Sequence, residues 1–135
     1  MSTEASTGPR RAVETDAAPA PIGPYSQAVV ANGVLYVSGQ VPLDPATERL
    51  VEGGIVEQAR RCLENLDAIC RAAGTTLSDA ARIGIYLTDM AAFPDVNEVY
   101  AGFFSEPFPV RSTVGVAALP KGALVEMDAT VPLSP

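Results

Sequence analysis

The sequence predicts an α/β domain in which two helices pack on one face of a β-sheet. Two segments place apolar residues at intervals of three and four, the period of a helix with one buried face. Five shorter segments have the apolar alternation or clustering of strands, and the order of segments is strand, strand, helix, strand, helix, strand, strand. At 135 residues the chain has the length of one domain, able to bury about two thirds of its unfolded surface.

The first two strands are expected at Gln27–Ala31 and Val34–Ser38. Asn32-Gly33 separates them, and this pair supplies the two positive-φ residues of a type I′ turn. The spacing therefore predicts a β-hairpin.

The two helices are expected at Ile55–Ala73 and at about Pro94–Phe104. In the first, charged residues occupy the face opposite the apolar stripe, and Gly74 stands where a glycine commonly ends a helix. Cys62 and Cys70 fall within its stripe, about 12 Å apart along the helix, which predicts reduced core residues rather than a disulfide.

The remaining strands are expected at Ala81–Thr88, Ser112–Ala117 and Leu124–Val131. We expect the last two to form a hairpin in which the numbers of opposed residues sum to 241. This register places apolar residues on one face, and on the other it sets Thr113 opposite Asp128 and Gly115 opposite Glu126.

Arg111 stands at the end of that polar face, so its side chain and that of Glu126 are expected to lean toward each other. Arginine is suited to a bidentate grip on a carboxylate, and a protected glutamate can position and activate water. The alternative is an ordinary ion pair on a solvated sheet face, which the spacing alone favours.

Residues 1–20 mix small, polar and charged residues without a period, which predicts a disordered tail before an ordered domain at 21–135. The sequence has neither a run of about 20 apolar residues nor a secretory signal, so we expect a cytoplasmic protein without a membrane partner. The bare face of the sheet needs a cover, and oligomerisation is the natural one.

The composition excludes several chemistries. The chain has no histidine, so triads and metal sites that need imidazole are ruled out. The formal charge is −7 and the single lysine is Lys121, which argues against a nucleic-acid partner held by phosphate neutralisation.

Six separated stretches resemble, in order and spacing over about residues 18–133, the RidA/YjgF family. They are Pro21–Ala28, Val37–Pro45, Gln58 with Asn65-Leu66, Asp95–Tyr100 before Phe103-Phe104, Pro109–Val114, and Leu119–Ala123 with Val125-Glu126. The resemblance implies a chorismate-mutase-like mixed β-sheet that assembles as a trimeric barrel, a homotrimer with active sites between subunits. It also implies hydrolysis of reactive enamines and imines, such as 2-aminoacrylate, 2-iminopropanoate and 2-iminobutanoate, to 2-keto acids and ammonia, without metal or cofactor.

The same resemblance implies roles for individual residues. Arg111 would bind the substrate carboxylate and Glu126 would orient the attacking water, while the backbone carbonyl of Thr113 would contact the imine nitrogen. Several family members have cysteine at the Thr113 position. Tyr25, Ser38, Gly39 and Asn97 match positions that line the family's cleft.

Two other functions stay open at this stage. One is a deaminase dedicated to a single pathway, acting on an aminoacrylate or an aminomuconate-like compound. The other is a chaperone-like or sensing trimer that binds small carboxylates without turnover. A ribonuclease activity, ascribed to some relatives, fits poorly with an acidic chain that has one lysine and no histidine.

Overall fold

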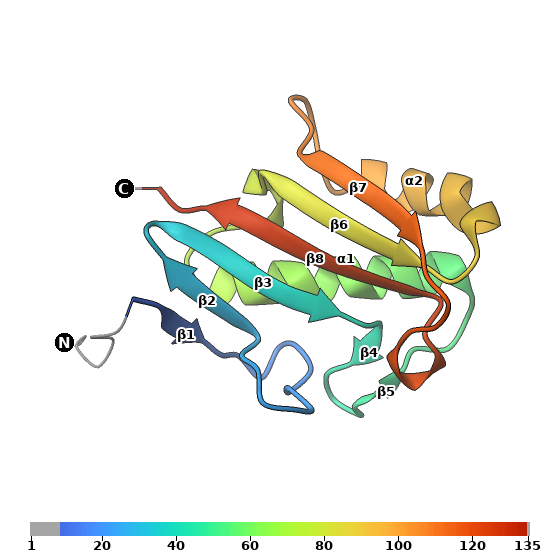
Figure 1. Ribbon diagram of the computed structural model, residues 1–135, viewed down its shortest axis with the longest axis horizontal. Helices are drawn as coiled ribbons and strands as arrows, with labels where there is room; N and C mark the ends of the chain where they lie inside the picture. The colour runs from blue at the N-terminus through green and yellow to red at the C-terminus, as the bar shows by residue number, and fades with distance from the viewer. Residues whose placement is uncertain (1–8, 135) are drawn as a thin grey trace.

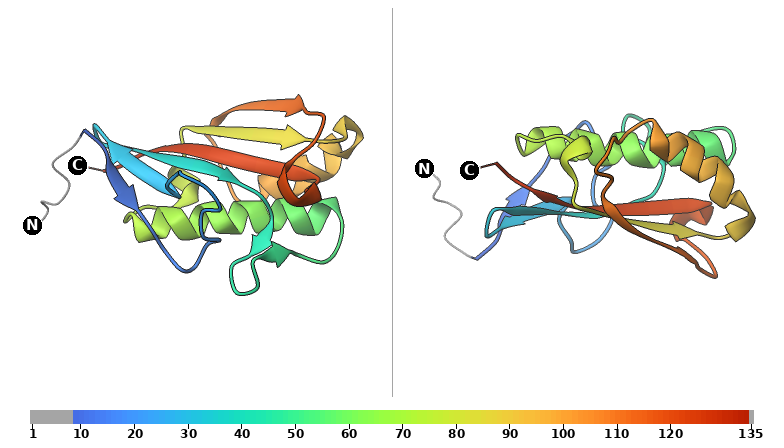
Figure 2. Two further views of the ribbon diagram at one scale, coloured as in Figure 1. Left: turned by 60° about the horizontal axis from the view of Figure 1, so that its bottom comes forward. Right: turned by 90° about the horizontal axis from the view of Figure 1, so that it is seen from above.

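Within residues 9–134, which the computed structural model describes, six strands form one mixed sheet and two α-helices lie on the same face of it (Figures 1 and 2). The predicted α/β architecture is therefore confirmed. The elements are β1 (Arg11–Val13), β2 (Ala28–Ala31), β3 (Val34–Gln40), β4 (Leu43–Asp44), β5 (Arg49–Leu50), α1 (Ile55–Ala72), β6 (Arg82–Leu87), α2 (Phe93–Ala101), β7 (Val110–Gly115) and β8 (Val125–Pro132). Short 3₁₀ turns occupy Leu77–Asp79, Met90–Ala92 and Pro120–Gly122.

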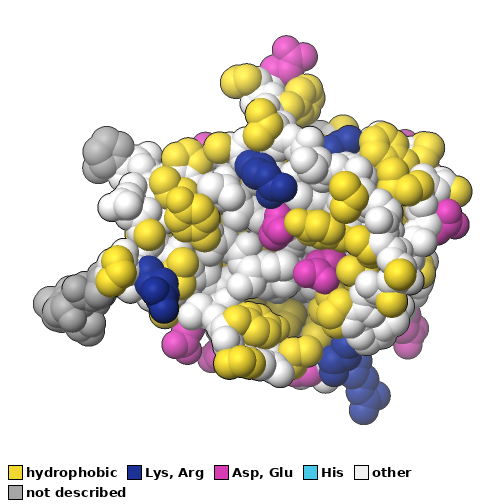
Figure 3. Space-filling view, viewed as in Figure 1, with side chains coloured by type: hydrophobic (Ala, Val, Ile, Leu, Met, Phe, Trp, Pro, Cys, Tyr) yellow, Lys and Arg dark blue, Asp and Glu magenta, His cyan; other side chains and the backbone are white. Residues whose placement is uncertain are grey.

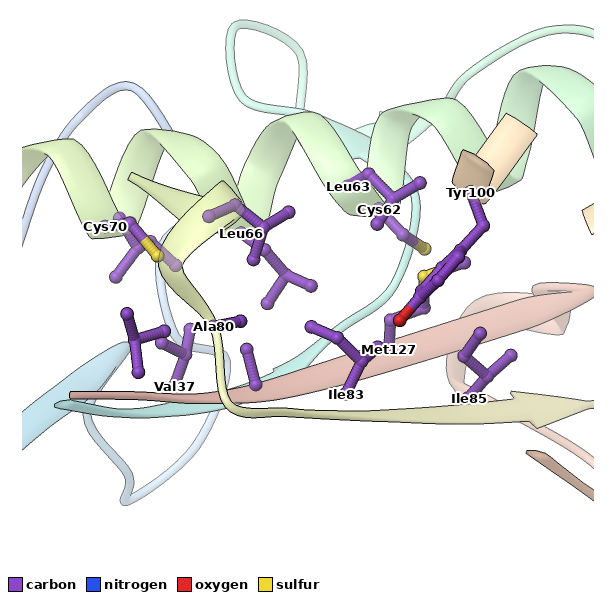
Figure 4. Packing of buried hydrophobic residues seen from close by; sticks show 14 of the residues in the cluster. Val37, Cys62, Leu63, Leu66, Cys70, Ala80, Ile83, Ile85, Tyr100 and Met127 are labelled. Carbon is purple, nitrogen blue, oxygen red and sulfur yellow. The ribbon is translucent and has the colours of Figure 1, made fainter. Parts of the chain in front are cut away.

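The core lies between the sheet and α1 (Figure 4). From Ala59 to Cys70 the apolar stripe of α1 is fully buried against the inward side chains of β3, β6 and β8, such as Leu35, Ile83 and Met127. The helix ends as the sequence predicts, with Gly74 at φ 86°. Asn32 and Gly33 also have the positive φ angles of the predicted hairpin turn, 52° and 76°.

Cys62 and Cys70 are buried, unpaired residues of this core, as predicted. The Cys62 thiol lies 3.2 Å from the carbonyl oxygen of Gln40, to which it donates. Burial raises the pKa of Cys70 to about 12 and that of Cys62 further, so neither is a thiolate at neutral pH.

The sheet order is β1-β2-β3-β8-β6-β7, which contradicts the predicted hairpin between the last two strands. β8 runs between β3 and β6, antiparallel to both, and β7 pairs in parallel with β6. The physical reason is that α2 connects β6 to β7, and a strand–helix–strand crossover produces a parallel pair. β8 takes the centre because its alternate residues, Val125 to Val131, are all buried under α1.

The second face of the sheet is uncovered in the single chain. Figure 3 shows this open face, where acidic and basic side chains lie around a hollow near its middle, between patches of hydrophobic side chains. The hydrophobic residues on its strands include Tyr36, Val110 and Val114, which are 47%, 69% and 44% exposed. Such exposure of large apolar residues on one face is typical of a surface that another protein covers.

The ordered domain begins before residue 21, so the predicted disordered segment is wrong from Arg11 onward. β1 pairs with β2, and Val13 and Ala18 are buried in the core. Apolar periodicity could not reveal this segment because β1 has only three residues. The residues after it are held by hydrogen bonds to Gln27 rather than by a regular apolar pattern. Residues 1–8 lie outside the described part of the chain.

Gln27 is the polar anchor of this segment. Its buried side-chain amide donates to the carbonyl oxygens of Thr15, Ala18 and Pro19 at 2.8–3.3 Å, and its Oε1 accepts from the Thr15 N–H at 2.8 Å. We expect Gln27→Ala to cost about 1–3 kcal/mol, because buried polar groups lose their partner. Hydrogen exchange should show faster exchange at residues 11–19 than in α1, whereas uniform protection would contradict the anchoring role.

No α-helix in the described range has both the length and the apolar character needed to cross a bilayer.

Candidate functional site

A cleft of about 350 Å³ opens on the uncovered face of the sheet and brings four of the predicted site residues together. Tyr25, Ser38, Gly39 and Glu126 line it, with Ile22, Val41 and Pro120. A second hollow of about 420 Å³ adjoins it along Tyr25 and Ser38, but no carboxylate lines that hollow. The first cleft is therefore the better candidate for acid–base chemistry.

Local backbone structure explains how Glu126 enters this cleft. The ladder between β3 and β8 is interrupted between Val37 and Gln40, and Gly39 sits in that bulge. A Cβ atom on Gly39 would overlap the Glu126 carboxylate, so only glycine lets this carboxylate lie over the backbone. The Ser38 hydroxyl donates to the carbonyl oxygen of Ser26 at 2.6 Å, which fixes the segment that leads to Tyr25.

Glu126 is half-buried, and burial raises the pKa of its carboxyl group, with a second contribution from the negative charge of Asp128. A raised pKa brings a carboxylate closer to the range in which it both accepts and returns a proton near neutral pH. Burial therefore makes the Glu126 carboxylate a stronger proton acceptor than an exposed one.

Asp128 belongs to a polar network that the sequence analysis did not identify. It follows Glu126 by two residues on the same face of β8, where Arg82 Nη1 lies 3.1 Å from its Oδ1 and the Tyr86 hydroxyl donates to its Oδ2 at 2.9 Å. Gly84 opposes Asp128 across the strands, and a Cβ there would overlap the carboxylate. The network fixes the position of the Asp128 carboxylate on the same face as Glu126.

Asp128→Asn should lower the pKa of Glu126, because the mutation removes a nearby negative charge and leaves the positive charge of Arg82. Titration of the Glu126 carboxyl carbon by NMR measures this directly, with Asp95→Asn on the exposed face of α2 as the control. An unchanged or higher pKa in Asp128→Asn would show that Asp128 does not act on Glu126.

The other predicted residues gather on the opposite side of the sheet, around Arg111. Its Cζ atom lies 5.4 Å from the centroid of the Phe93 ring and 4.8 Å from that of Tyr100, both on α2. Asn97 follows Phe93 by one helical turn, so it lies on the same side of α2. Arg111, Asn97 and the two rings form what we call the arginine cluster.

Thr113 adds a backbone group to this region. β7 is an edge strand, and the N–H groups of Val110 and Val116 donate to the carbonyl oxygens of Ala81, just before β6, and Leu87, at its end, at 2.9 and 2.8 Å. In a parallel pair the residues between such positions direct N–H and C=O away from the neighbour. The carbonyl of Thr113 therefore faces the unpaired edge of the sheet, on the strand that also holds Arg111.

Arg111 and Glu126 lie on opposite faces of the sheet, which corrects the prediction that they lean toward each other. Arg111 is in register with the buried Ile83, and Glu126 is in register with Tyr86 of the open face. β6 also lies between their strands. The hairpin register failed because a strand pattern assigns side chains to two faces without identifying the neighbouring strand.

Two buried amides hold the loops that line the open-face cleft, and the sequence analysis gave them no role in the site. Gln58 Oε1 accepts from the Leu124 N–H at 2.8 Å and so fixes the loop that contains Pro120. Asn65 Nδ2 donates to the carbonyl oxygens of Leu43 and Val41 at 3.0 and 3.4 Å. Their place in an otherwise apolar helix stripe is the pattern that could have identified them.

The chain is thus an α/β protein with two helices on one face of a mixed sheet, a carboxylate-lined cleft on the open face and the arginine cluster on the other side. The family model described as Endoribonuclease L-PSP matches residues 15–132, and the chain belongs to this family, which includes proteins named RutC and RidA. The predicted resemblance is thus confirmed.

Individual relatives and a solved structure support the same family assignment. The chain is 51% identical over 122 residues to RutC family protein y4sK of Sinorhizobium fredii, covering 90% of this chain and 97% of that protein. It is 46% identical over 120 residues to 2-iminobutanoate/2-iminopropanoate deaminase of Capra hircus, covering 89% and 88%. The crystal structure of RidA from the Antarctic bacterium Psychrobacter sp. PAMC 21119 superimposes with a TM-score of 0.88 at 45% identity, covering 91% of this chain and 99% of the other.

Proposed function

We propose that this protein hydrolyses reactive 2-imino acids, such as 2-iminopropanoate and 2-iminobutanoate, to 2-keto acids and ammonia. The observation that carries the proposal is the pair of complementary clusters, an unneutralised arginine on one side and a protected carboxylate on the other. The name of the goat relative, 2-iminobutanoate/2-iminopropanoate deaminase, supports the same chemistry. The formal charge of −7 disfavours an RNA substrate.

The reaction needs few catalytic groups because the imine carbon is already electrophilic. Arg111 binds the substrate carboxylate through its guanidinium fork, and Glu126 takes a proton from water as the oxygen adds to the imine carbon. Glu126 returns this proton to the imine nitrogen, which gives a carbinolamine. The carbinolamine hydroxyl then loses its proton to Glu126, which passes it to the amino nitrogen as the C–N bond breaks, so that ammonia leaves and the carbonyl forms. One water is consumed, and no electron is exchanged.

The active site forms between two copies of the chain. Because Arg111 and Glu126 lie on opposite faces of the sheet, one molecule cannot place both on one small substrate. A neighbouring copy packed on the open face would bring its β7 edge, with Arg111, Asn97 and the Thr113 carbonyl, toward the cleft that contains Glu126. In a closed homotrimer, the open face of each chain is covered by a neighbouring chain in this way.

The oligomeric state is tested by light scattering at micromolar concentration. We expect the mass of three 14.0 kDa chains. A monomer mass would contradict the shared site.

Activity is tested by generating 2-aminoacrylate in the cuvette with a PLP-dependent dehydratase and following keto-acid release. The protein should accelerate release over the spontaneous rate. If release is equal with and without the protein, the proposed function is wrong, and a carboxylate-binding role without turnover replaces it.

A further inference from the structure

Arg111 contacts aromatic rings, whereas three other arginines of the described chain form ion pairs. Arg61, Arg71 and Arg82 each pair with a carboxylate, Glu64, Asp67 and Asp128 respectively. No carboxylate within residues 9–134 lies at ion-pair distance from Arg111; aromatic rings contact it instead. Among residues 9–134, its charge is therefore held in place without a carboxylate that neutralises it.

The two rings come from one face of α2, and the Tyr100 ring is held by burial and by packing on Phe104. Phe93 and Tyr100 are seven residues apart, two helical turns, so both rings reach the β7 edge together. Tyr100 is 6% exposed and its ring packs on Phe104, with centroids 4.5 Å apart. Figure 4 shows the Tyr100 ring extending from its helix toward the sheet beside Met127.

The hydroxyl of Tyr100 contributes little to this arrangement. It is buried and finds no hydrogen-bond partner among the described residues. A buried hydroxyl without a partner costs free energy, so the residue is explained by its ring rather than by its oxygen. The ring face, which is electron-rich, attracts a guanidinium at this distance.

We propose that Phe93 and Tyr100 are positioning residues that hold the Arg111 guanidinium by cation–π contacts and leave its N–H fork and full charge for the carboxylate of a small ligand. The proposal rests on the proposed function, since it names the device that prepares Arg111 for its substrate. A carboxylate partner in the same place would also hold the arginine, but it would occupy the N–H fork and cancel the charge. Aromatic faces avoid both effects.

The ligand class follows from this geometry. A guanidinium presents its N–H donors only in its own plane, so a fork that no protein carboxylate occupies selects a planar carboxylate approaching edge-on. A neutral amide of the same shape has one oxygen to accept and no charge to match. The site should therefore prefer 2-keto and 2-imino carboxylates over the corresponding amides.

Phe93→Leu, Tyr100→Leu and Tyr100→Phe test the proposal in the assembled protein. The first readout is calorimetric binding of pyruvate. Each leucine variant should weaken pyruvate binding about 3- to 30-fold, the range of one cation–π contact, while Tyr100→Phe should bind as the wild type does. Thermal melts identify a leucine variant that does not fold, and Phe93 is only half-buried, so its variant is the more tolerant one.

The second readout is the NMR signal of the Arg111 Nε–H proton, assigned by its loss in Arg111→Lys. Ring currents should shift it upfield in the wild type and Tyr100→Phe, and each leucine variant should move it back toward the free value. A leucine variant that moves this signal yet binds pyruvate normally would overturn the proposal, as would weakened binding with an unmoved signal. If wild type does not bind pyruvate but its signal is shifted, the proposed function fails separately from the cation–π contact.

Discussion

Glu126→Gln is expected to lower kcat for imine hydrolysis by about 100- to 10,000-fold, the usual contribution of a general base. Glutamine has nearly the same shape and still fits over Gly39, so the cleft should keep its form. The spontaneous hydrolysis of the imine sets the floor of the measurement. The loss should be in kcat, because the carboxylate of the substrate is bound elsewhere, by Arg111.

Glu98→Gln is the matched control, because Glu98 is an exposed carboxylate on α2. It should leave kcat unchanged. If Glu126→Gln retained more than about a third of the wild-type kcat, Glu126 would not be the base.

Arg111→Ala is expected to lower kcat/KM by about 30- to 5,000-fold, the cost of removing one partner of a desolvated, hydrogen-bonded charge pair. Unlike Glu126→Gln, it should raise KM strongly, since it removes binding of the substrate carboxylate. Arg111→Lys should recover only part of the loss, because an ammonium group lacks the planar fork.

Arg71→Ala controls for the loss of an arginine. Arg71 is exposed on α1 and pairs with Asp67 at 2.7 Å, a contact of the surface type that contributes at most about 1 kcal/mol. Its kinetics should match the wild type. Equal keto-acid release by Arg111→Ala and wild type would contradict the role of Arg111.

Local features of the fold were predictable because nearby residues determine them. The stripe of α1 and the Asn32-Gly33 turn need no knowledge of the rest of the chain, and both are as predicted. The position of β8 depends on long-range packing, so alternation alone could not supply it. The strand–helix–strand order around α2 did contain the information that β6 and β7 are parallel.

Candidate site residues could be named from the sequence, but their arrangement could not. The family resemblance named Arg111 and Glu126, whereas their separation onto opposite faces follows only from the strand order. The supporting residues were harder to find from sequence. Asp128 resembles any polar position of an exposed strand face, and Tyr100 fits equally well as a plain core residue.

The shared site is tested most directly by mixing two inactive variants, Arg111→Ala and Glu126→Gln. Neither chain alone can build a complete site. In trimers reassembled from equal amounts of both, about a quarter of the junctions should combine an intact Arg111 with an intact Glu126, and about a quarter of wild-type activity should return. If mixed trimers form, as mass measurement of differently tagged chains can establish, and no activity returns, the site does not lie between subunits.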